Sequence, residues 1–308
     1  MIKTFRANGK LLLSGEYFVL DGAKALAVPT QKGQTLEVSA LDENYLLWQS
    51  WTVDGTLWFE CQLNATDLKI LVASDQDVAD RLVLMLQNAK MQNPAFLLKN
   101  GLKISTYLEF ARDWGLGSSS TLICLIAKWA KVDAFQILFH SMRGSGYDIA
   151  CGMTDTPIFY EINGQTPTVE VVSFFPQFAE NLYFVHLGKK QNSREGIARY
   201  RAKAAQNEVS INEISAISKE ILISKDLQVF NDLLLRHEEI ISKIIELPRA
   251  KTLYFPDFHY GEIKSLGAWG GDFVLVSSDI GFEKTKEYFQ SKNYRTCIPY
   301  HKMILSMK

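Results

Sequence analysis

Two glycines and three serines stand directly before an apolar segment near the middle of the chain, and residues of these types can bind an anion. In order, the stretch reads Gly115, Leu116, Gly117, Ser118, Ser119 and Ser120. Glycine lets the backbone turn sharply and approach a ligand closely, because it has no Cβ atom. Serines at a helix start leave the first N–H groups pointing outward, where the helix dipole favours phosphate. The pattern therefore predicts a phosphate loop, with an ordinary serine-capped buried helix as the alternative.

Three further turns that contain glycine carry charged residues suited to handling an anionic ligand. Lys10 follows the first turn, Asp148 lies in the second, and the third runs over residues 267–271 up to Asp272. Taken singly, a lysine on a strand is usually solvated and an aspartate near a helix start usually caps it. Both interpretations stay open beside a catalytic lysine and a catalytic aspartate.

Strands and helices must position these four turns, and the hydrophobic pattern predicts where they lie. We expect strands at about 2–7, 25–29, 34–40, 46–51, 56–60, 102–108, 158–162, 182–187, 273–276 and 296–300. We expect helices at about 75–91, 118–131, 133–142 and 282–291, and a mostly helical block over 195–246. This order favours an α+β fold class with helices packed on one face of an antiparallel sheet.

Composition and charge exclude several classes of function. The 33 basic and 34 acidic residues nearly balance, whereas a nucleic-acid or membrane-surface binder needs an excess of lysine and arginine. The four cysteines form no CxxC pair, which argues against a zinc site or a disulfide framework. No segment reaches the roughly 18 apolar residues of a membrane span. We therefore expect a cytoplasmic protein, monomer or homodimer, that acts on a small molecule, with no nucleic-acid or membrane partner.

Four segments resemble, in chain order, the motifs of the GHMP small-molecule kinases. Residues 7–17 (Ala-Asn-Gly-Lys-Leu-Leu-Leu-Ser-Gly-Glu-Tyr) are similar to the first motif, and residues 115–120 to the ATP-binding motif. Residues 144–150 (Gly-Ser-Gly-Tyr-Asp-Ile-Ala) resemble the segment with the catalytic aspartate in the mevalonate and phosphomevalonate kinase branch. Residues 267–271 (Gly-Ala-Trp-Gly-Gly) are similar to the third glycine-rich motif. The resemblance therefore covers almost the whole chain.

The resemblance implies a GHMP kinase fold with two domains. The N-terminal domain is expected to be similar to domain 2 of ribosomal protein S5 and to bind the nucleotide, and the C-terminal domain to be ferredoxin-like. We place the change near residues 165–180, where Pro167 and Pro176 interrupt the pattern. The expected domains are residues 1–170 and 171–308.

The resemblance also implies cofactors and residue roles. ATP and Mg²⁺ are the implied cofactors, with residues 115–120 holding the phosphates and the Ser119 hydroxyl contacting Mg²⁺. Asp148 is the implied catalytic base, and Lys10 the cation that keeps it ionised. The implied substrate-binding residues are Glu16, Tyr17, Ser145, Gly146, Gly267, Ala268, Gly270 and Gly271. For Tyr17, a structural role at a domain interface is the alternative.

Four residues depart from the family pattern, and the first is Asn8, which replaces the usual proline before Gly-Lys. Mevalonate kinases place a magnesium-binding glutamate about eleven positions before the catalytic aspartate, and Ile137 stands there in this chain. Trp269 and Asp272 replace small residues of the third motif, so that the indole would narrow a substrate pocket. A carboxylate beside phosphates repels them unless a metal ion or another cation intervenes.

Together these observations predict a kinase that transfers the γ-phosphoryl group of ATP to mevalonate or phosphomevalonate. A galactokinase-like or homoserine kinase-like activity is the nearer alternative. A non-catalytic nucleotide or metabolite sensor on the same fold is the alternative from another class. The missing glutamate and Asp272 favour the sensor, whereas the presence of both Lys10 and Asp148 argues against it.

Overall fold

The computed structural model describes residues 2–97, 101–142, 144–189, 193–203, 208–267, 269 and 271–305. The chain divides into two compact units that interleave along the sequence. Unit 1 comprises residues 1–9, 32–112 and 116–153, and unit 2 comprises residues 10–31, 113–115 and 154–308. The domains expected from the sequence, 1–170 and 171–308, are contiguous segments and stay a prediction.

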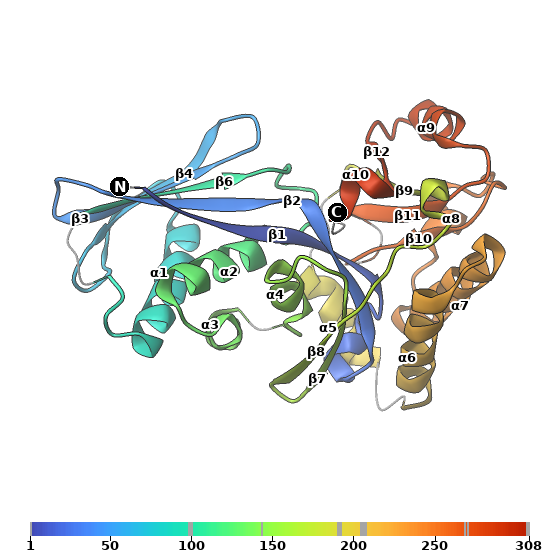
Figure 1. Ribbon diagram of the computed structural model, residues 1–308, viewed down its shortest axis with the longest axis horizontal. Helices are drawn as coiled ribbons and strands as arrows, with labels where there is room; N and C mark the ends of the chain where they lie inside the picture. The colour runs from blue at the N-terminus through green and yellow to red at the C-terminus, as the bar shows by residue number, and fades with distance from the viewer. Residues whose placement is uncertain are drawn as a thin grey trace. The chain divides into compact units, whose positions relative to one another are not determined.

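A mixed sheet with helices on one face makes up unit 1 (Figure 1). Its strands run in the order β5 (Ile70–Ala73), β4 (Leu57–Asn64), β3 (Tyr45–Trp51), β6 (Leu102–Leu108) and β2 (Ala25–Ala40). Its helices are α1 (Gln76–Gln92), α2 (Ser118–Ala130), α3 (Ala134–Ser141) and α4 (Tyr147–Gly152). Strand β3 is parallel to β6, and the other registered pairs of this sheet are antiparallel.

The core of unit 1 lies between the sheet and helices α1 to α3. Trp48 and Phe59 from the sheet pack there with Leu82 of α1 and Ile123 of α2, each at most 2% exposed. Helix α1 forms where the sequence predicts it, because its apolar residues recur at helical spacing and Asp75 accepts a hydrogen bond from the Val78 N–H at 3.1 Å. This packing fixes the start of α2 relative to the sheet.

A four-stranded antiparallel sheet is the centre of unit 2. Its order is β10 (Ile263–Ser265), β11 (Phe273–Ser277), β9 (Leu182–His186) and β12 (Cys297–Pro299). All residues of β9, β10 and β11 are buried, as expected for a sheet covered on both faces. Strands β7 (Ile158–Asn163) and β8 (Thr166–Val171) form a hairpin that pairs with residues 25–27 of β2.

The remaining elements of unit 2 are helical. They are η1 (Phe18–Asp21), η2 (Ala179–Asn181), α5 (Ser193–Lys203), α6 (Glu208–Ile223), α7 (Leu227–Ile245), α8 (Ala250–Tyr254), α9 (Phe282–Ser291) and α10 (Tyr300–Met303). Helices α6 and α7 lie side by side (Figure 1). Within the described ranges, no helix is both long and apolar enough to cross a membrane.

The structure confirms the α+β class and most predicted elements, and it corrects those predicted within the first 40 residues. The predicted strand at 2–7 and turn at Asn8-Gly9 are one continuous strand, β1 (Lys3–Ser14), and the predicted strands at 25–29 and 34–40 are both part of β2. The reason is that β1 pairs with β2, and β1 is a single strand that includes Asn8 and Gly9. Gly33 permits this pairing, since a Cβ atom there would lie 2.2 Å from the Ala7 carbonyl oxygen.

Candidate active site

The start of α2 in unit 1 presents backbone N–H groups that no side chain caps among the described residues. Gly117 is the N-cap residue and has a left-handed backbone with φ 86°, which glycine adopts without strain. Leu116 is fully buried and anchors the loop, whereas Ser119 is exposed. A helix of 13 residues that starts in this way favours an anion at its N-terminus. The serine-capped helix, our alternative, is not what the structure shows, because glycine takes the cap position.

Asp148 lies beside this helix start, also in unit 1. It belongs to the first turn of α4, which begins after Gly146 with φ 88°. The Ser120 hydroxyl donates a hydrogen bond to Asp148 Oδ2, and the Ile149 N–H donates one to Oδ1 at 3.1 Å. The side chain is half-buried. Unit 1 therefore holds a carboxylate next to the last serine of the predicted phosphate loop.

Lys10 extends from β1 in unit 2 to the first residue of that loop. Its ammonium group is half-buried and donates a hydrogen bond to the Gly115 carbonyl oxygen at 3.1 Å. The lysine is therefore placed on the backbone of the glycine-rich segment, which differs from the solvated strand residue of our alternative interpretation. Lys10 carries a positive charge to the point where the loop begins.

The third glycine-rich segment meets the same residue. A Cβ atom built on Gly115 would lie 2.4 Å from both Cγ and Oδ2 of Asp272, so the carboxyl group lies directly against the Gly115 backbone. A Cβ atom on Gly267 would lie 3.8 Å from the same Oδ2 atom. Unit 2 thus brings together Lys10, Gly115, Gly267 and Asp272, which the sequence separates by as much as 262 positions (272 − 10).

Other predicted substrate residues are in more enclosed positions. Ser145 and Gly146 are buried, and so is Gly271. Ala268 and Gly270 lie outside the described residues. The Trp269 indole is 3% exposed, packs with Tyr17 and Tyr200 in a core cluster and donates from Nε1 to the Pro248 carbonyl at 3.3 Å. Substrate contact by the predicted set stays a prediction.

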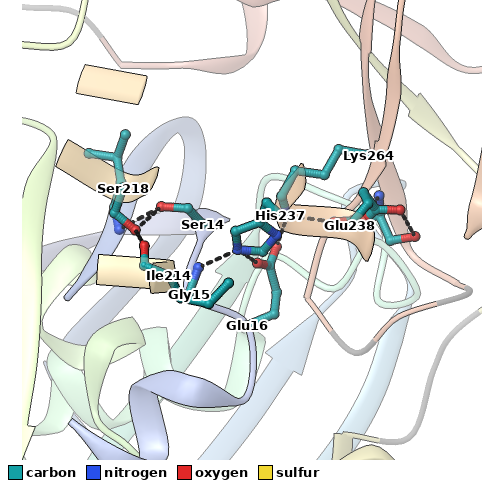
Figure 2. Close-up of polar contacts among 10 residues, drawn as sticks. Ser14, Gly15, Glu16, Ile214, Ser218, His237, Glu238 and Lys264 are labelled. Carbon is teal, nitrogen blue, oxygen red and sulfur yellow. Dashed lines mark hydrogen bonds and ion pairs between the residues drawn. The ribbon is translucent and has the colours of Figure 1, made fainter. Parts of the chain in front are cut away.

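Glu16 and Tyr17, from the first motif, are both buried in unit 2. Tyr17 is 7% exposed and its ring stacks on Tyr200 with 5.7 Å between centroids. Glu16 is 1% exposed and forms an ion pair with the Lys264 ammonium (Figure 2). Both side chains have the contacts of interior residues of unit 2, and the substrate role of Glu16 and Tyr17 and the interface role of Tyr17 stay predictions.

The partners of Glu16 form a buried polar cluster, which we define as Glu16, His237, Glu238 and Lys264. His237 Nε2 accepts a hydrogen bond from the Gly15 N–H at 2.9 Å and lies 3.3 Å from Glu16 Oε2 (Figure 2). The Ser265 N–H donates to Glu238 Oε1 at 3.1 Å. All four side chains are at most 1% exposed.

Burial controls the protonation of this cluster. Desolvation, and then the charge of Lys264, holds the pKa of His237 well below its usual range, so the imidazole is neutral and free to accept from Gly15. Desolvation raises the pKa of Glu16, and it raises the pKa of Glu238 to about 8.

Sequence reasoning missed His237, Glu238 and Lys264. A signal existed, because His237 and Glu238 interrupt the apolar face of α7 at positions that helical spacing places in the core.

The residues present fit ATP and Mg²⁺. The uncapped start of α2 suits phosphate, and the exposed Ser119 hydroxyl is a hard oxygen ligand of the kind that Mg²⁺ prefers. The described part of the chain holds no group of three or more His, Cys, Asp or Glu residues that could bind a metal by themselves. Ile137 is fully buried in the core and offers no ligand. The fit is therefore to a metal ion that arrives with the nucleotide.

Comparison with solved structures identifies the fold. The chain is similar to the mevalonate kinase of Methanococcus jannaschii, with a TM-score of 0.71, 19% identity and coverage of 97% of this chain and 98% of that one. It is also similar to the Streptococcus pneumoniae phosphomevalonate kinase, with a TM-score of 0.66, 15% identity and coverage of 95% of this chain and 97% of that one. A third similar structure is the Lactococcus lactis galactokinase in complex with galactose, with a TM-score of 0.68, 12% identity and coverage of 94% of this chain and 88% of that one. The chain has the GHMP kinase fold over nearly its full length.

Comparisons of the sequence with protein-family models and with curated proteins found no match. Because the sequence identities to these three structures are all below 20%, the similarity establishes the fold, and the chemistry must be argued from the residues of the site.

Proposed function

We propose that the protein is a kinase that uses ATP and Mg²⁺ to phosphorylate a small metabolite. The observation that carries this proposal is the hydrogen bond from Ser120 to Asp148, which holds a carboxylate beside the uncapped N-terminus of α2. A phosphate-binding helix start and a candidate base are thereby adjacent within one unit. The shared fold and the position of Lys10 on Gly115 support the same activity.

The proposed reaction is phosphoryl transfer from ATP to an acceptor hydroxyl or phosphate. The acceptor oxygen forms a bond to the γ-phosphorus, the bond between that phosphorus and the β–γ bridging oxygen breaks, and ADP leaves. For a hydroxyl acceptor, Asp148 orients the group and accepts its proton. Lys10 and the N–H groups of residues 117–120 stabilise charge on the phosphoryl oxygens. Mg²⁺, when bound with the nucleotide, supplies further charge neutralisation, and Ser119 is its proposed protein ligand.

For the acceptor we propose mevalonate or phosphomevalonate. The Gly-Tyr-Asp-Ile-Ala segment and the structural similarity to kinases of both compounds support this choice. The similarity to a galactokinase keeps galactose as the nearer alternative, with homoserine beside it. The non-catalytic sensor is the alternative from another class: Ile137 in place of the glutamate and Asp272 favour it, whereas the presence of Lys10 and Asp148 argues against it.

A panel assay tests the proposal. ADP release from Mg·ATP is measured with mevalonate, phosphomevalonate, galactose and homoserine as acceptors. We expect a strong signal with mevalonate or phosphomevalonate. A signal with galactose or homoserine alone would replace the acceptor and keep the kinase. Nucleotide binding without turnover on any acceptor would favour the sensor.

A further inference from the structure

Two segments of unit 2 that meet on Gly115 meet a second time inside the buried polar cluster. The first is the end of β1, which carries Lys10 and continues into Gly15 and Glu16. The second is β10, which ends at Ser265 and leads into the third glycine-rich segment. The contacts on Gly115 are half-buried, whereas those in the cluster are enclosed. The cluster is therefore where the two segments are held together away from solvent.

Three consecutive residues at the end of β1 are each held by a side chain from a different element: Ser14, Gly15 and Glu16 (Figure 2). The Ser14 hydroxyl donates to Ser218 Oγ of α6 at 2.7 Å. The Gly15 N–H donates to His237 Nε2 of α7 at 2.9 Å. The Glu16 carboxylate forms its ion pair with the Lys264 ammonium group of β10. All of these side chains are at most 1% exposed, so water does not compete for their bonds.

The backbone directly after these three residues is strained. Tyr17 has φ 62° and ψ −49°, and the Phe18 N–H donates to the Glu16 carbonyl oxygen at 2.7 Å. This is a γ-turn of the form with positive φ, which is rare for a residue with a side chain. Such a conformation persists only where the surrounding structure determines it. The bonds to Gly15 and Glu16 do so here.

The chemistry of the cluster favours a role in positioning. Replacing a buried ion pair such as that of Glu16 and Lys264 by apolar residues is often neutral or stabilising. Apolar contact has no preferred direction, whereas hydrogen bonds and ion pairs fix one arrangement. Ser265 is fixed in the same way, because its N–H donates to Glu238 at 3.1 Å and its carbonyl accepts from Lys264 at 2.9 Å. The cluster thus defines one relative position of β1 and β10.

We infer that His237 is a positioning residue for the proposed reaction and that it acts through Lys10. By holding the Gly15 N–H, the imidazole fixes the end of β1. Lys10 lies in the same strand, roughly 17 Å before Gly15 at about 3.3 Å per residue. A shift of the strand end therefore moves the Lys10 ammonium group relative to the Gly115 carbonyl. This inference rests on the proposed function, in which Lys10 stabilises charge on the phosphoryl group.

A double-mutant cycle of His237→Phe and Lys10→Met tests the inference. His237→Phe removes the acceptor of the Gly15 N–H. A misplacement of about 1 Å costs up to about 10²-fold in rate, so we expect kcat to fall by about 10- to 100-fold. In the Lys10→Met background the same substitution should change kcat by less than about twofold, because its effect passes through Lys10. His237→Gln, which keeps an acceptor atom, should retain most of the wild-type kcat.

Nuclear magnetic resonance of ¹⁵N-labelled lysine ammonium groups gives a second readout, which needs neither nucleotide nor acceptor. The Lys10 signal is identified by its loss in Lys10→Met. We expect it to move toward the signals of solvated lysines in His237→Phe and to stay in place in His237→Gln. Thr285→Val is the matched control, because Thr285 is a buried threonine of the same unit whose hydroxyl donates to Ser278 at 2.7 Å. It should lower stability and leave the Lys10 signal and kcat unchanged.

Circular dichroism checks that each variant is folded under the conditions of the assays. If His237→Phe does not fold, Ser218→Ala replaces it, because that variant removes the neighbouring bond to Ser14 and leaves the ion pair of the cluster intact. The expected changes in the Lys10 signal and in kcat have the same direction.

The outcomes separate this inference from the proposed function. A wild-type protein that turns over no acceptor, but whose Lys10 signal still depends on His237, would overturn the proposed function and keep the positioning of Lys10. An unchanged Lys10 signal in folded His237→Phe overturns the inference, with or without turnover. So does a loss of kcat that is equally large in the Lys10→Met background, or an equal effect of Thr285→Val.

Discussion

Unit 2 contains two sets of charged residues that differ in burial and in their partners. Lys10 and Asp272 are half-buried and both lie on the backbone of Gly115. The buried polar cluster of Glu16, His237, Glu238 and Lys264 is enclosed, and its members contact one another or nearby backbone. A charge that keeps access to solvent can still meet a ligand, whereas an enclosed charge is bound to the fold. We therefore assign chemistry to the first set and stability to the second.

The largest effect on folding is expected from Lys264→Met. Removing the ammonium group leaves Glu16 as a buried charge without its cation, which costs about 3–5 kcal/mol in the free energy of unfolding. Urea unfolding followed by circular dichroism measures the loss. Lys10→Met is the matched control, and a similar loss in that variant would erase the distinction between the two sets.

For activity we expect the opposite order, with a larger loss of kcat in Lys10→Met than in Lys264→Met. Lys10→Met removes a positive charge from the first residue of the loop, and loss of one such stabilising group lowers kcat by about 10²- to 10³-fold. Its unfolding free energy should stay near the wild-type value, because the side chain is half-buried and its ammonium group keeps access to solvent. Steady-state ADP release measures kcat. Full activity in Lys10→Met would remove the lysine from the mechanism.

Substitution of His237 should have a smaller effect on the free energy of unfolding. The effect comes from the lost hydrogen bond to Gly15 of the first motif. His237→Phe keeps a ring of similar size but leaves the buried Gly15 N–H without its acceptor, at a cost of about 1–3 kcal/mol. Thermal or urea unfolding gives the value. An unchanged stability would mean that the hydrogen bond to Gly15 contributes nothing to the fold.

Glu238 provides a test by pH. Its pKa is raised to about 8 in the folded protein, so between about pH 4.5 and 8 the folded state keeps a proton that the unfolded state releases. Stability from this group therefore falls as pH rises, by up to about 1.4 kcal/mol per unit, and levels off above pH 8. His237, with its lowered pKa, acts in the opposite direction below about pH 6.5, where the unfolded state binds its proton.

The clearest window is consequently pH 6.5 to 8. The wild-type protein should lose stability relative to Glu238→Gln as the pH rises through this range, and urea unfolding at several pH values measures the difference. A constant difference would show that Glu238 does not titrate with a raised pKa.

The smallest effect is expected at an exposed ion pair. Arg236 Nη2 lies 2.7 Å from Glu213 Oε1, and the two side chains are 52% and 31% exposed. Such pairs contribute about 0–1 kcal/mol to the free energy of unfolding. Arg236→Ala should therefore change the unfolding free energy by less than any variant of the buried polar cluster. A cost comparable to that of Lys264→Met would contradict the weight that we give to burial.

Local pattern predicted much of the fold and of the site. The strands at 46–51 and 56–60 and helix α1 were predictable, because the Asp54-Gly55 turn between the strands and the apolar periodicity of the helix are each encoded within a few residues. The glycine-rich turns with Lys10 and Asp148 were predictable from their order along the chain. The hydrogen bonds of Lys10 to Gly115 and of Ser120 to Asp148 required the structure.

What sequence missed depends on contacts between distant segments. Glu16 and Lys264 are 248 residues apart, and no local pattern links a glutamate after a turn to a lysine on a short strand. Strand β8 was missed because Pro167 suggested an interruption, although an edge strand tolerates proline. The Asn8-Gly9 step was read as a turn because pairing between β1 and β2 is not visible in sequence.

The most direct test of the central claim compares wild type with Asp148→Ala in two assays on the same preparations. ATP affinity is measured by calorimetry, and turnover by ADP release with the acceptor that the panel identifies. We predict that the variant binds ATP with wild-type affinity while turnover falls by about 10²- to 10⁴-fold, the usual contribution of a positioned base. Unchanged turnover in Asp148→Ala would contradict the account, because it would leave the carboxylate beside the start of α2 without a part in the reaction.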